Sequence, residues 1–366
     1  MATYRFDEIA INSTKKKKPT EEDKAHYIGL EHIDPGCFNI VRWGSDVAPT
    51  GDKLLMQKGD VLFGKRRAYQ RKVGIAPFDG IFSAHGMVLR PNTEIIDANY
   101  FPFFISSDRF METAVRISVG GLSPTINWKD LAKQEFDLPT LEEQKVLADK
   151  LWAAYRLKEA YKKLLAATDE MVKSQFIEMF GDSPTKELRD VCIQSGEYGS
   201  NTPADTYDGN TRYVRITDIN DYGKLNKELV SPRVIEEKYL LTKNDLLFAR
   251  TGNTVGKTYL HEHGRMIYAG YLIRYRLNKE IMLPEFAFAF THTSIYYDWV
   301  ERTKKVGAQP NISAAQYDKM PILVPSMGQQ RAFVAVAEQA DKSKSYVLIA
   351  FKNLESMLRY CIGQIA

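Results

Sequence analysis

The sequence has few of the features that mark disulfide-bonded, metal-bound or membrane-spanning proteins. Its three cysteines, Cys37, Cys192 and Cys361, lie far apart and form neither a CxxC pair nor the Cys/His spacing of a zinc site. No window reaches the roughly 18 apolar residues that cross a bilayer, and the N-terminal segment has no apolar stretch of signal-peptide length. We therefore expect a protein of the reducing cytoplasm, without a disulfide framework, a structural metal or membrane insertion.

An excess of one charge is also missing. The formal net charge is +4 and the isoelectric point about 8.6, which is compatible with a nucleic-acid partner but does not by itself indicate one. A length of 366 residues with 44% hydrophobic residues exceeds the usual size of a single core. The composition therefore predicts two or more soluble domains.

The sequence contains an internal repeat with a spacing of about 186 residues. Four pairs of segments match in order and spacing, each within about one residue of this offset: LPTLEEQKVLADKL from Leu138 with VPSMGQQRAFVAVA from Val324, GLSPTINWKDL from Gly121 with GAQPNISAAQY from Gly307, KGDVLFGKR from Lys58 with KNDLLFART from Lys243, and YIGLEHID from Tyr27 with YVRITDIN from Tyr213. Convergent strand and turn patterning is the alternative to duplication. Four matches in register favour duplication.

Within each half, the pattern changes from strand-like to helical. Short runs rich in Val, Leu, Phe and Tyr predict strands at 60–63, 86–89, 246–249 and 272–275, with helical pieces between them. Apolar residues at near-heptad spacing then predict a long helix in each half, over about 141–180 and 326–366. The expected seam of the first helix consists of Leu147, Leu151, Ala154, Tyr161, Leu164, Thr168, Met171, Gln175 and Met179.

A helix over 141–180 is roughly 60 Å long at 1.5 Å per residue. A rod with one apolar seam is marginal alone, so its expected partner is the equivalent helix of the other half, packed antiparallel in a pseudo-twofold arrangement. The alternative is a long amphipathic helix that lies on the core of its own domain. The polar stretch 341–345 in the second helix interrupts the seam and favours this alternative.

Three phrases resemble the specificity subunits of type I restriction-modification systems. They are DLLFARTGNTVGK from Asp245, the G-x-x-P-x-I phrase, and the LPTLEEQ helix start whose helix ends in SQFIEMFGD at Asp182. The resemblance spans nearly the whole chain. It implies an α+β fold of two target recognition domains, at 1–140 and 182–325, that alternate with conserved coiled-coil helices at 141–181 and 326–366. It also implies that each recognition domain reads one half of a split site in double-stranded DNA.

The same resemblance implies partners. Two methyltransferase subunits are expected along the conserved helices, and motor-nuclease subunits are expected to join for cleavage. The chain itself is expected to be non-catalytic and to hold no cofactor. Because the two helices set the distance between the recognition domains, we expect a bipartite target with a fixed, unread spacer.

The candidate DNA-binding residues follow the predicted strands, because cations bind phosphates while amide, hydroxyl and guanidinium groups read base edges. In the first half they are Lys65, Arg66, Arg67, Tyr69, Arg71, Lys72, Arg116, Ser123 and Thr125. In the second half they are Arg250, Thr251, Asn253, Thr254, Lys257, Lys304, Lys305, Gln309 and Asn311. The loop after the first strand is also consistent with a solvated charged turn. The second is also consistent with a tight hairpin whose polar groups satisfy their own backbone.

Several neighbouring features have a structural explanation of their own. Asn127 and Ser313 are expected to cap helices, and capping with domain closure is the main role expected for the loops before them. The four lysines at 15–18 are expected to form a solvated flexible run that also has the charge to reach phosphates. Glu143 and Lys145 are expected to form a surface pair on the helix rather than part of a nuclease motif.

Sequence motifs for catalysis are absent. GNTVGKT differs from a phosphate-binding P-loop because Thr251 stands where the first Gly is required, and no long helix follows. His261-Glu262-His263 lacks the i, i+4 spacing of a zinc protease. No Asn-Pro-Pro-aromatic phrase of an amino-methyltransferase is present. Two other functions stay open at this stage: a non-catalytic fragment of a single-component restriction or methylation enzyme, and a protein-binding scaffold.

Overall fold

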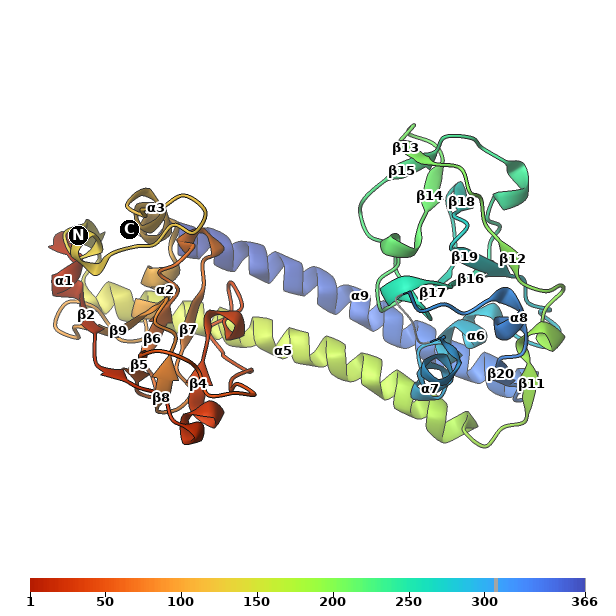
Figure 1. Cartoon of the computed structure of the whole chain (residues 1–366), viewed down its shortest axis with the longest axis horizontal. Helices are drawn as coiled ribbons and strands as arrows, with labels where there is room; N and C mark the ends of the chain where they lie inside the picture. The colour runs from red at the N-terminus through yellow and green to blue at the C-terminus, as the bar shows by residue number, and fades with distance from the viewer. Residues whose placement is uncertain (306–308, 366) are drawn as a thin grey trace. The chain divides into compact units, whose positions relative to one another are not determined.

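The computed structural model describes residues 1–305 and 309–365, which divide into two compact units (Figure 1). Unit 1 consists of Met1–Lys162 with Ile349–Ala366, and unit 2 consists of Lys163–Leu348. The long helices α5 (Leu141–Phe180) and α9 (Met327–Gly363) each contribute residues to both units. Gly307, the first residue of the second G-x-x-P phrase, lies outside the described residues, as does Ala366.

The β structure of unit 1 consists mainly of two four-stranded sheets. The first has the order β2 (Ala10–Ser13), β9 (Met87–Pro91), β6 (Val61–Phe63) and β7 (Val73–Ile75), all antiparallel. The second has the order β3 (Lys16–Lys17), β5 (Lys53–Met56), β8 (Gly80–Phe82) and β4 (Tyr27–Ile28), with β4 and β8 parallel. A separate antiparallel pair joins β1 (Ala2–Arg5) to β10 (Glu135–Leu138).

The lysine run at 15–18 differs from the expectation of a flexible segment. Lys16 and Lys17 form β3 and pair with Leu54 and Lys53. The ammonium of Lys17 also lies 2.9 Å from the Asp23 carboxylate. Backbone pairing with β5 orders this short strand, and the run alone gives no sign of a partner strand so far away in the sequence.

Short helices and aromatic side chains fill the interior of unit 1. The α-helices are α1 (Phe6–Ile9), α2 (Phe101–Ser106), α3 (Asp108–Arg116) and α4 (Trp128–Leu131), and the 3₁₀ helices are η1 (Glu21–His26), η2 (Leu30–His32) and η3 (Ala68–Gln70). The ring of Phe6 lies 5.2 Å from that of Phe110 and 5.9 Å from that of Phe136, and all three side chains are buried. Leu151 of α5 and Leu358 of α9 pack on the same core.

Unit 2 contains a four-stranded sheet and three two-stranded pairs. The sheet has the order β12 (Glu197–Tyr198), β19 (Leu272–Tyr275), β16 (Leu246–Ala249) and β17 (Thr258–Leu260). The pairs are β11 (Thr185–Glu187) with β20 (Pro321–Leu323), β13 (Ala204–Thr206) with β15 (Val230–Pro232), and β14 (Arg212–Val214) with β18 (Met266–Tyr268). The strands expected at 246–249 and 272–275 are confirmed, and those expected at 60–63 and 86–89 are confirmed with small shifts of their ends.

Helices cover the other parts of the unit 2 core. The α-helices are α6 (Pro284–Phe290), α7 (Ser294–Thr303) and α8 (Ala314–Asp318), and the 3₁₀ helices are η4 (Leu188–Val191), η5 (Ile216–Asp218), η6 (Glu237–Tyr239) and η7 (Gly252–Thr254). Phe176 of α5 lies 4.9 Å from Phe286 and 5.1 Å from Phe333 of α9, measured between ring centroids. The expected cap at Ser313 is confirmed, since its side chain accepts from the backbone N–H of Gln316. Asn127 occupies the N-cap position of α4 without a side-chain cap bond.

The face of α5 that packs inward matches the expected seam only in part: Leu151 is buried and Ala154 is half-buried, as expected. Leu147, Leu164, Met171 and Met179 are 39–51% exposed, whereas the buried residues of the helix are Gln144, Ala148, Leu151, Tyr155, Lys158, Phe176 and Phe180. The reason is that each unit offers α5 an aromatic core of its own, with Phe38 and Phe103 in unit 1 and Phe286 and Phe333 in unit 2. Packing on these cores decides which face of α5 is buried. This agrees with the alternative of a long amphipathic helix that lies on the core of its own domain.

Both long helices begin with the same buried glutamine contact. Gln144 Oε1 accepts from Asp97 N–H at 2.8 Å, while its Nε2 donates to the carbonyls of Ile95 and Pro139. Gln330 repeats this pattern with Leu283 N–H and the carbonyls of Ile281 and Pro325. Both side chains are fully buried. Each glutamine satisfies three backbone groups and fixes the start of its helix on its own unit. Glu143 accepts from the Thr140 hydroxyl instead of pairing with Lys145, which lies 3.1 Å from Glu142.

Candidate nucleic-acid interface

In unit 1, the loop after β6 is attached to the loop that precedes α4. The backbone N–H of Arg67 donates to Pro124 O at 2.7 Å, and Ile126 N–H donates to Lys65 O at 3.0 Å. Arg66 and Thr125, which lie between these two hydrogen bonds, form an isolated antiparallel β-bridge. The sequence-predicted residues of 65–67 and 123–125, which are more than fifty positions apart, therefore lie side by side.

Arg67 carries the side-chain contact between these loops. Its Nη2 and Nε donate to Ser123 Oγ at 3.0 and 3.2 Å. Its backbone φ is +56°, and Arg71 at the other end of η3 has φ +53°. Left-handed backbone is unfavourable for long side chains and is kept where the surrounding structure determines it. Tyr69, between the two arginines, is 55% exposed.

Not every predicted cation of unit 1 is free to meet a phosphate. The guanidinium of Arg71 lies 2.6 Å from Asp108 and donates to Ser106 O at 2.8 Å. Lys72 Nζ donates to Leu30 O at 2.6 Å. Arg116 donates to the Gln134 amide oxygen at 3.1 Å. These contacts compete with phosphate binding, because each cation already has an acceptor within the protein.

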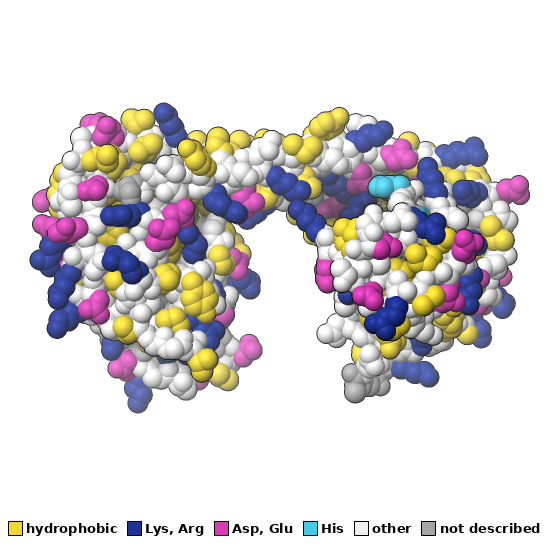
Figure 2. Space-filling model, turned by 90° about the horizontal axis from the view of Figure 1, so that it is seen from above, with side chains coloured by type: hydrophobic (Ala, Val, Ile, Leu, Met, Phe, Trp, Pro, Cys, Tyr) yellow, Lys and Arg dark blue, Asp and Glu magenta, His cyan; other side chains and the backbone are white. Residues whose placement is uncertain are grey.

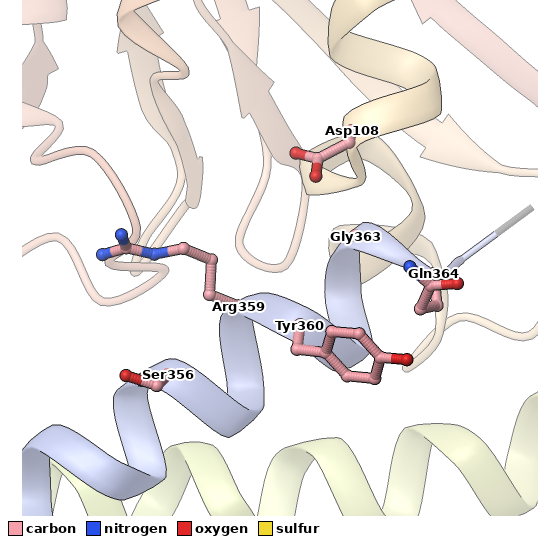
Figure 3. A pocket seen from close by; sticks show the side chains of 6 residues that line it. All are labelled: Asp108, Ser356, Arg359, Tyr360, Gly363 and Gln364. Atoms are coloured by element: carbon pink, nitrogen blue, oxygen red, sulfur yellow. The ribbon is translucent and has the colours of Figure 1, made fainter.

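Asp108, the partner of Arg71, also lines a shallow cavity of about 300 Å³ in unit 1. Figure 3 shows Asp108 above the last turns of α9, where Arg359 and Tyr360 point to opposite sides. A Cβ on Gly363 would lie 2.7 Å from Asp108 Oδ2, so this glycine allows α9 to come close to α3.

The remaining charges near 65–67 raise the local positive potential. Burial, with a smaller contribution from Lys16, lowers the pKa of the Lys65 ammonium. Burial and then the charges of Arg66, Lys65 and Lys53 lower the pKa of His85, whose Nε2 lies 3.4 Å from Arg66 Nη1. A phosphate at this position would relieve the repulsion between these groups. His85 and Lys53 are absent from the sequence-based prediction, and Lys16 entered it only as part of the lysine run 15–18. The folded chain brings all three near the loop.

Unit 2 attaches its corresponding loops with the same backbone pattern. Gly252 N–H donates to Pro310 O, and Ile312 N–H donates to Arg250 O, both at 2.9 Å. Thr251 and Asn311 form the antiparallel bridge. Gly252 has φ +69°, a conformation that glycine adopts at little cost. The polar side chains predicted at this turn therefore start from a backbone that two loops hold in place.

Arg250 lies between an aromatic ring and an amide. Its guanidinium carbon is 4.7 Å from the centroid of the Tyr198 ring, and its Nε donates to Asn311 Oδ1 at 3.2 Å. Its backbone N–H donates to Tyr271 O, and the Tyr271 side chain is 59% exposed. Tyr198 and Tyr271 are further candidates that the sequence did not single out. Stacking and a hydrogen bond together fix the orientation of the planar guanidinium.

Other predicted residues of unit 2 are engaged by neighbours. Lys257 lies 2.8 Å from Asp221, and Lys304 lies 2.6 Å from Glu301. The Thr254 hydroxyl donates to Thr251 O, as expected for a tight turn that satisfies its own backbone. Lys305 donates through its backbone to Asn311 O at 3.3 Å, which places it beside the same loop. Asn253 and Gln309 lie in the two loops, and their side chains make no hydrogen bond within the described part of the chain.

On the face shown in Figure 2, lysine and arginine side chains are interspersed with acidic and apolar ones on each unit. Among residues 1–305 and 309–365, no group of three or more potential metal ligands comes together. Within that same part of the chain, no helix combines the length and apolarity needed to span a bilayer. The loop clusters at 65–67 and 250–252 are therefore the features that the geometry singles out.

Two solved structures share the fold of this chain. The S subunit of a type I restriction-modification system from M. genitalium has a TM-score of 0.58 at 15% identity, covering 100% of this chain and 95% of that one. A chain from a study of complex assembly and conformational transition of the type I R-M system has a TM-score of 0.61 at 17% identity, covering 100% and 97%. At these identities the likeness concerns the fold, which is that of type I specificity subunits.

The family model described as the type I restriction modification DNA specificity domain matches the chain twice, over residues 2–167 and 181–346. The chain belongs to this family. The resemblance seen in the sequence and the non-catalytic class that it implies agree with this assignment.

The named relatives are type I restriction enzyme specificity subunits. That of EcoDI from Escherichia coli is 25% identical over 195 residues, covering 50% of this chain and 42% of the relative, so the match spans less than half of that protein. That of EcoKI from Escherichia coli K12 is 22% identical over 386 residues, covering 92% and 78%. That of StySPI from Salmonella potsdam is 22% identical over 361 residues, covering 89% and 76%.

Proposed function

We propose that this chain is the DNA specificity subunit of a type I restriction-modification complex. In this role it reads a bipartite target in double-stranded DNA and directs methyltransferase and nuclease subunits, without being the catalyst. The observation that carries the proposal is the repeated loop attachment, Arg67 N–H to Pro124 O in unit 1 and Gly252 N–H to Pro310 O in unit 2. The two units thus present one loop scaffold with two sets of side chains. This is what the reading of two different half-sites requires.

We assign 1–140 and 182–325 as the recognition domains and 141–181 and 326–366 as the conserved helices. The contacts of Phe176 with Phe333 and of Asp169 with Lys344, at 2.6 Å, support antiparallel pairing of the helices, because the residue number rises along one helix as it falls along the other. Such pairing would form the coiled coil of a pseudo-twofold repeat. The pairing would place the ion pair of Asp169 and Lys344 between the two helices, and such a pair favours one helix register over others.

Partner subunits are proposed along α5. Apolar side chains that the units leave exposed lie on this helix at Val146, Leu147, Leu157, Leu164, Met171 and Met179. Large exposed apolar residues on one helix are typical of a protein-binding surface. Two methyltransferase subunits are the proposed occupants, with motor-nuclease subunits added for cleavage.

The helices are proposed to act as a ruler for the unread spacer. A seven-residue insertion after Lys162 and a matching one after Leu348 keep the heptad pattern and lengthen each helix by about 10 Å. We expect the unread gap to grow by about three base pairs, since DNA rises about 3.4 Å per base pair. Methylation sites mapped in cells should keep both half-sites and change only the gap. An unchanged gap would disprove the ruler.

The function itself is tested by mapping DNA methylation in cells that carry the methyltransferase subunit with and without this chain. The expected result is a bipartite motif that is methylated only when the chain is present. Methylation that does not depend on the chain would overturn the proposal. DNA methylated by the purified chain alone would instead support an enzyme fragment. Specific binding should also persist in gel shifts at salt concentrations that suppress scrambled DNA, whereas a protein-binding scaffold would show no such difference.

A further inference from the structure

Leu122 stands at the tip of a closed loop in unit 1. Val119 and Thr125 exchange two backbone hydrogen bonds, at 3.0 and 2.9 Å, which close the loop at its base. The Leu122 side chain is 98% exposed. Gly120 has φ +110°, and a Cβ built on Gly121 meets no atom within 4 Å. Neither glycine carries a side chain that could cover Leu122 from the N-terminal side of the loop.

The loop is attached to the cationic loop beside it. Arg67 binds the residues on the C-terminal side of Leu122, with its N–H on Pro124 O and its guanidinium on Ser123 Oγ. Arg66 and Lys65 contact the base of the same loop through Thr125 and Ile126. An apolar side chain thus stands on a loop that is attached, on its C-terminal side, to a loop of three cations.

This arrangement fits DNA better than an apolar protein surface. Cations of the adjoining loop would bind phosphates beside a groove, which would bring the tip toward the bases. A polar side chain at this tip would be well solvated by water. A leucine contributes favourable free energy there only if an apolar group covers its side chain. Bases offer such groups, because apolar side chains contact thymine methyls in the major groove and enter base steps in the minor groove.

We propose that Leu122 contacts bases directly in the half-site that unit 1 reads, and that it is a specificity-determining residue of this chain. The inference rests on the proposed DNA-reading function. It adds an apolar contact to a set of candidates that was otherwise polar, charged or aromatic.

The test uses the chain together with its methyltransferase subunit and maps methylated motifs genome-wide. Leu122→Ser removes the apolar contact, and Leu122→Met keeps it with a different shape. Ile11→Ser is the matched control: Ile11 is 59% exposed and pairs with Arg90, at the end of the β2–β9–β6 sheet opposite the loop after β6. Melting temperatures of all variants should equal that of the original chain, because each side chain removed is solvent-exposed.

We expect Leu122→Ser to relax the motif at one or two adjacent positions of one half-site, with about tenfold less discrimination there and the other half-site unchanged. Leu122→Met should retain preference at those positions, and Ile11→Ser should give the original motif. The proposal is overturned if Leu122→Ser methylates the original motif with unchanged preference. It is also overturned if methylation falls equally at all positions while less methyltransferase co-purifies, since that result assigns the tip to a protein contact. A missing motif for the original chain would instead refute the function itself.

Discussion

The guanidinium of Arg67 donates to Ser123 Oγ at 3.0 and 3.2 Å and so joins two loops that lie 56 residues apart in the sequence. The backbone of Arg67 is left-handed, with φ +56°. One side chain therefore contributes both a positive charge and the position of the neighbouring loop. Removing the charge and removing the attachment can be separated by mutation.

Arg67→Ala should weaken binding of the target duplex more than Ser123→Ala does. Arg67→Ala removes a cation and the side-chain bond to Ser123, whereas Ser123→Ala removes only that bond; the backbone bond from Arg67 N–H to Pro124 O remains in both. If Arg67 contacts a phosphate, the slope of log affinity against log salt should fall by about one unit for Arg67→Ala. Fluorescence anisotropy across a salt series gives both quantities. Lys58→Ala is the control, since Lys58 lies before β6, at the opposite end from this loop. An equal loss from Lys58→Ala would show that only net charge matters.

Arg250→Lys should impair reading of the second half-site although it keeps the charge. Lysine cannot reproduce the planar contact with Tyr198 or a bidentate bond to guanine. We expect a loss of roughly 1–3 kcal/mol in discrimination, about five- to 150-fold, at one position of that half-site. Competition binding with single-base variants of the target measures this. Discrimination equal to that of the original chain would exclude Arg250 as a base reader.

Gln144→Ala should destabilise unit 1 strongly. The substitution leaves Asp97 N–H and the carbonyls of Ile95 and Pro139 without their partner in a fully buried site. Because each unsatisfied buried group costs about 1–3 kcal/mol, we expect a loss on the order of 3 kcal/mol in the free energy of unfolding. Urea unfolding followed by circular dichroism gives the value. Exposed Gln57→Ala serves as the control, and a change within 0.5 kcal/mol is expected there, as for ordinary surface substitutions at about that scale.

Acid should destabilise unit 2 through His261. Burial lowers the pKa of this histidine, and the smaller opposing effect of Asp245 does not reverse the shift, which His263 reinforces. The folded chain thus keeps the ring neutral while the unfolded chain protonates below about pH 6.5. The stability contributed by the neutral ring is fully present above that pH and decreases as the pH falls below it.

His261→Gln should accordingly reduce the loss of unfolding free energy between pH 7.5 and pH 5.5. Urea unfolding at the two pH values measures the loss. The exposed His26→Gln variant should lose as much stability as the original chain, because that side chain faces solvent in unit 1. An identical pH dependence for His261→Gln and the original chain would contradict this role.

Much of the local structure follows from the sequence, because strands, turns and caps depend on residues close together in the chain. The runs at 246–249 and 272–275 became β16 and β19, and Ser313 caps α8. The backbone attachment of both loop pairs recurs at the spacing that the sequence matches gave. The paired positions of the loops that hold Arg67 and Arg250 could thus be located without a structure.

Only the tertiary structure decided which of the predicted cations remain available. Arg71 lies against Asp108 and Lys257 against Asp221, while Arg250 gains Tyr198 as a stacking partner. The aromatic cores of the two units likewise decided which part of the heptad pattern of α5 is buried, with Leu151 inside and Leu164 and Met171 exposed. These outcomes depend on residues far apart in the sequence, whose pairing no local pattern records. The sequence alone thus determined where the candidate DNA-binding loops lie, and the fold determined which side chains they present.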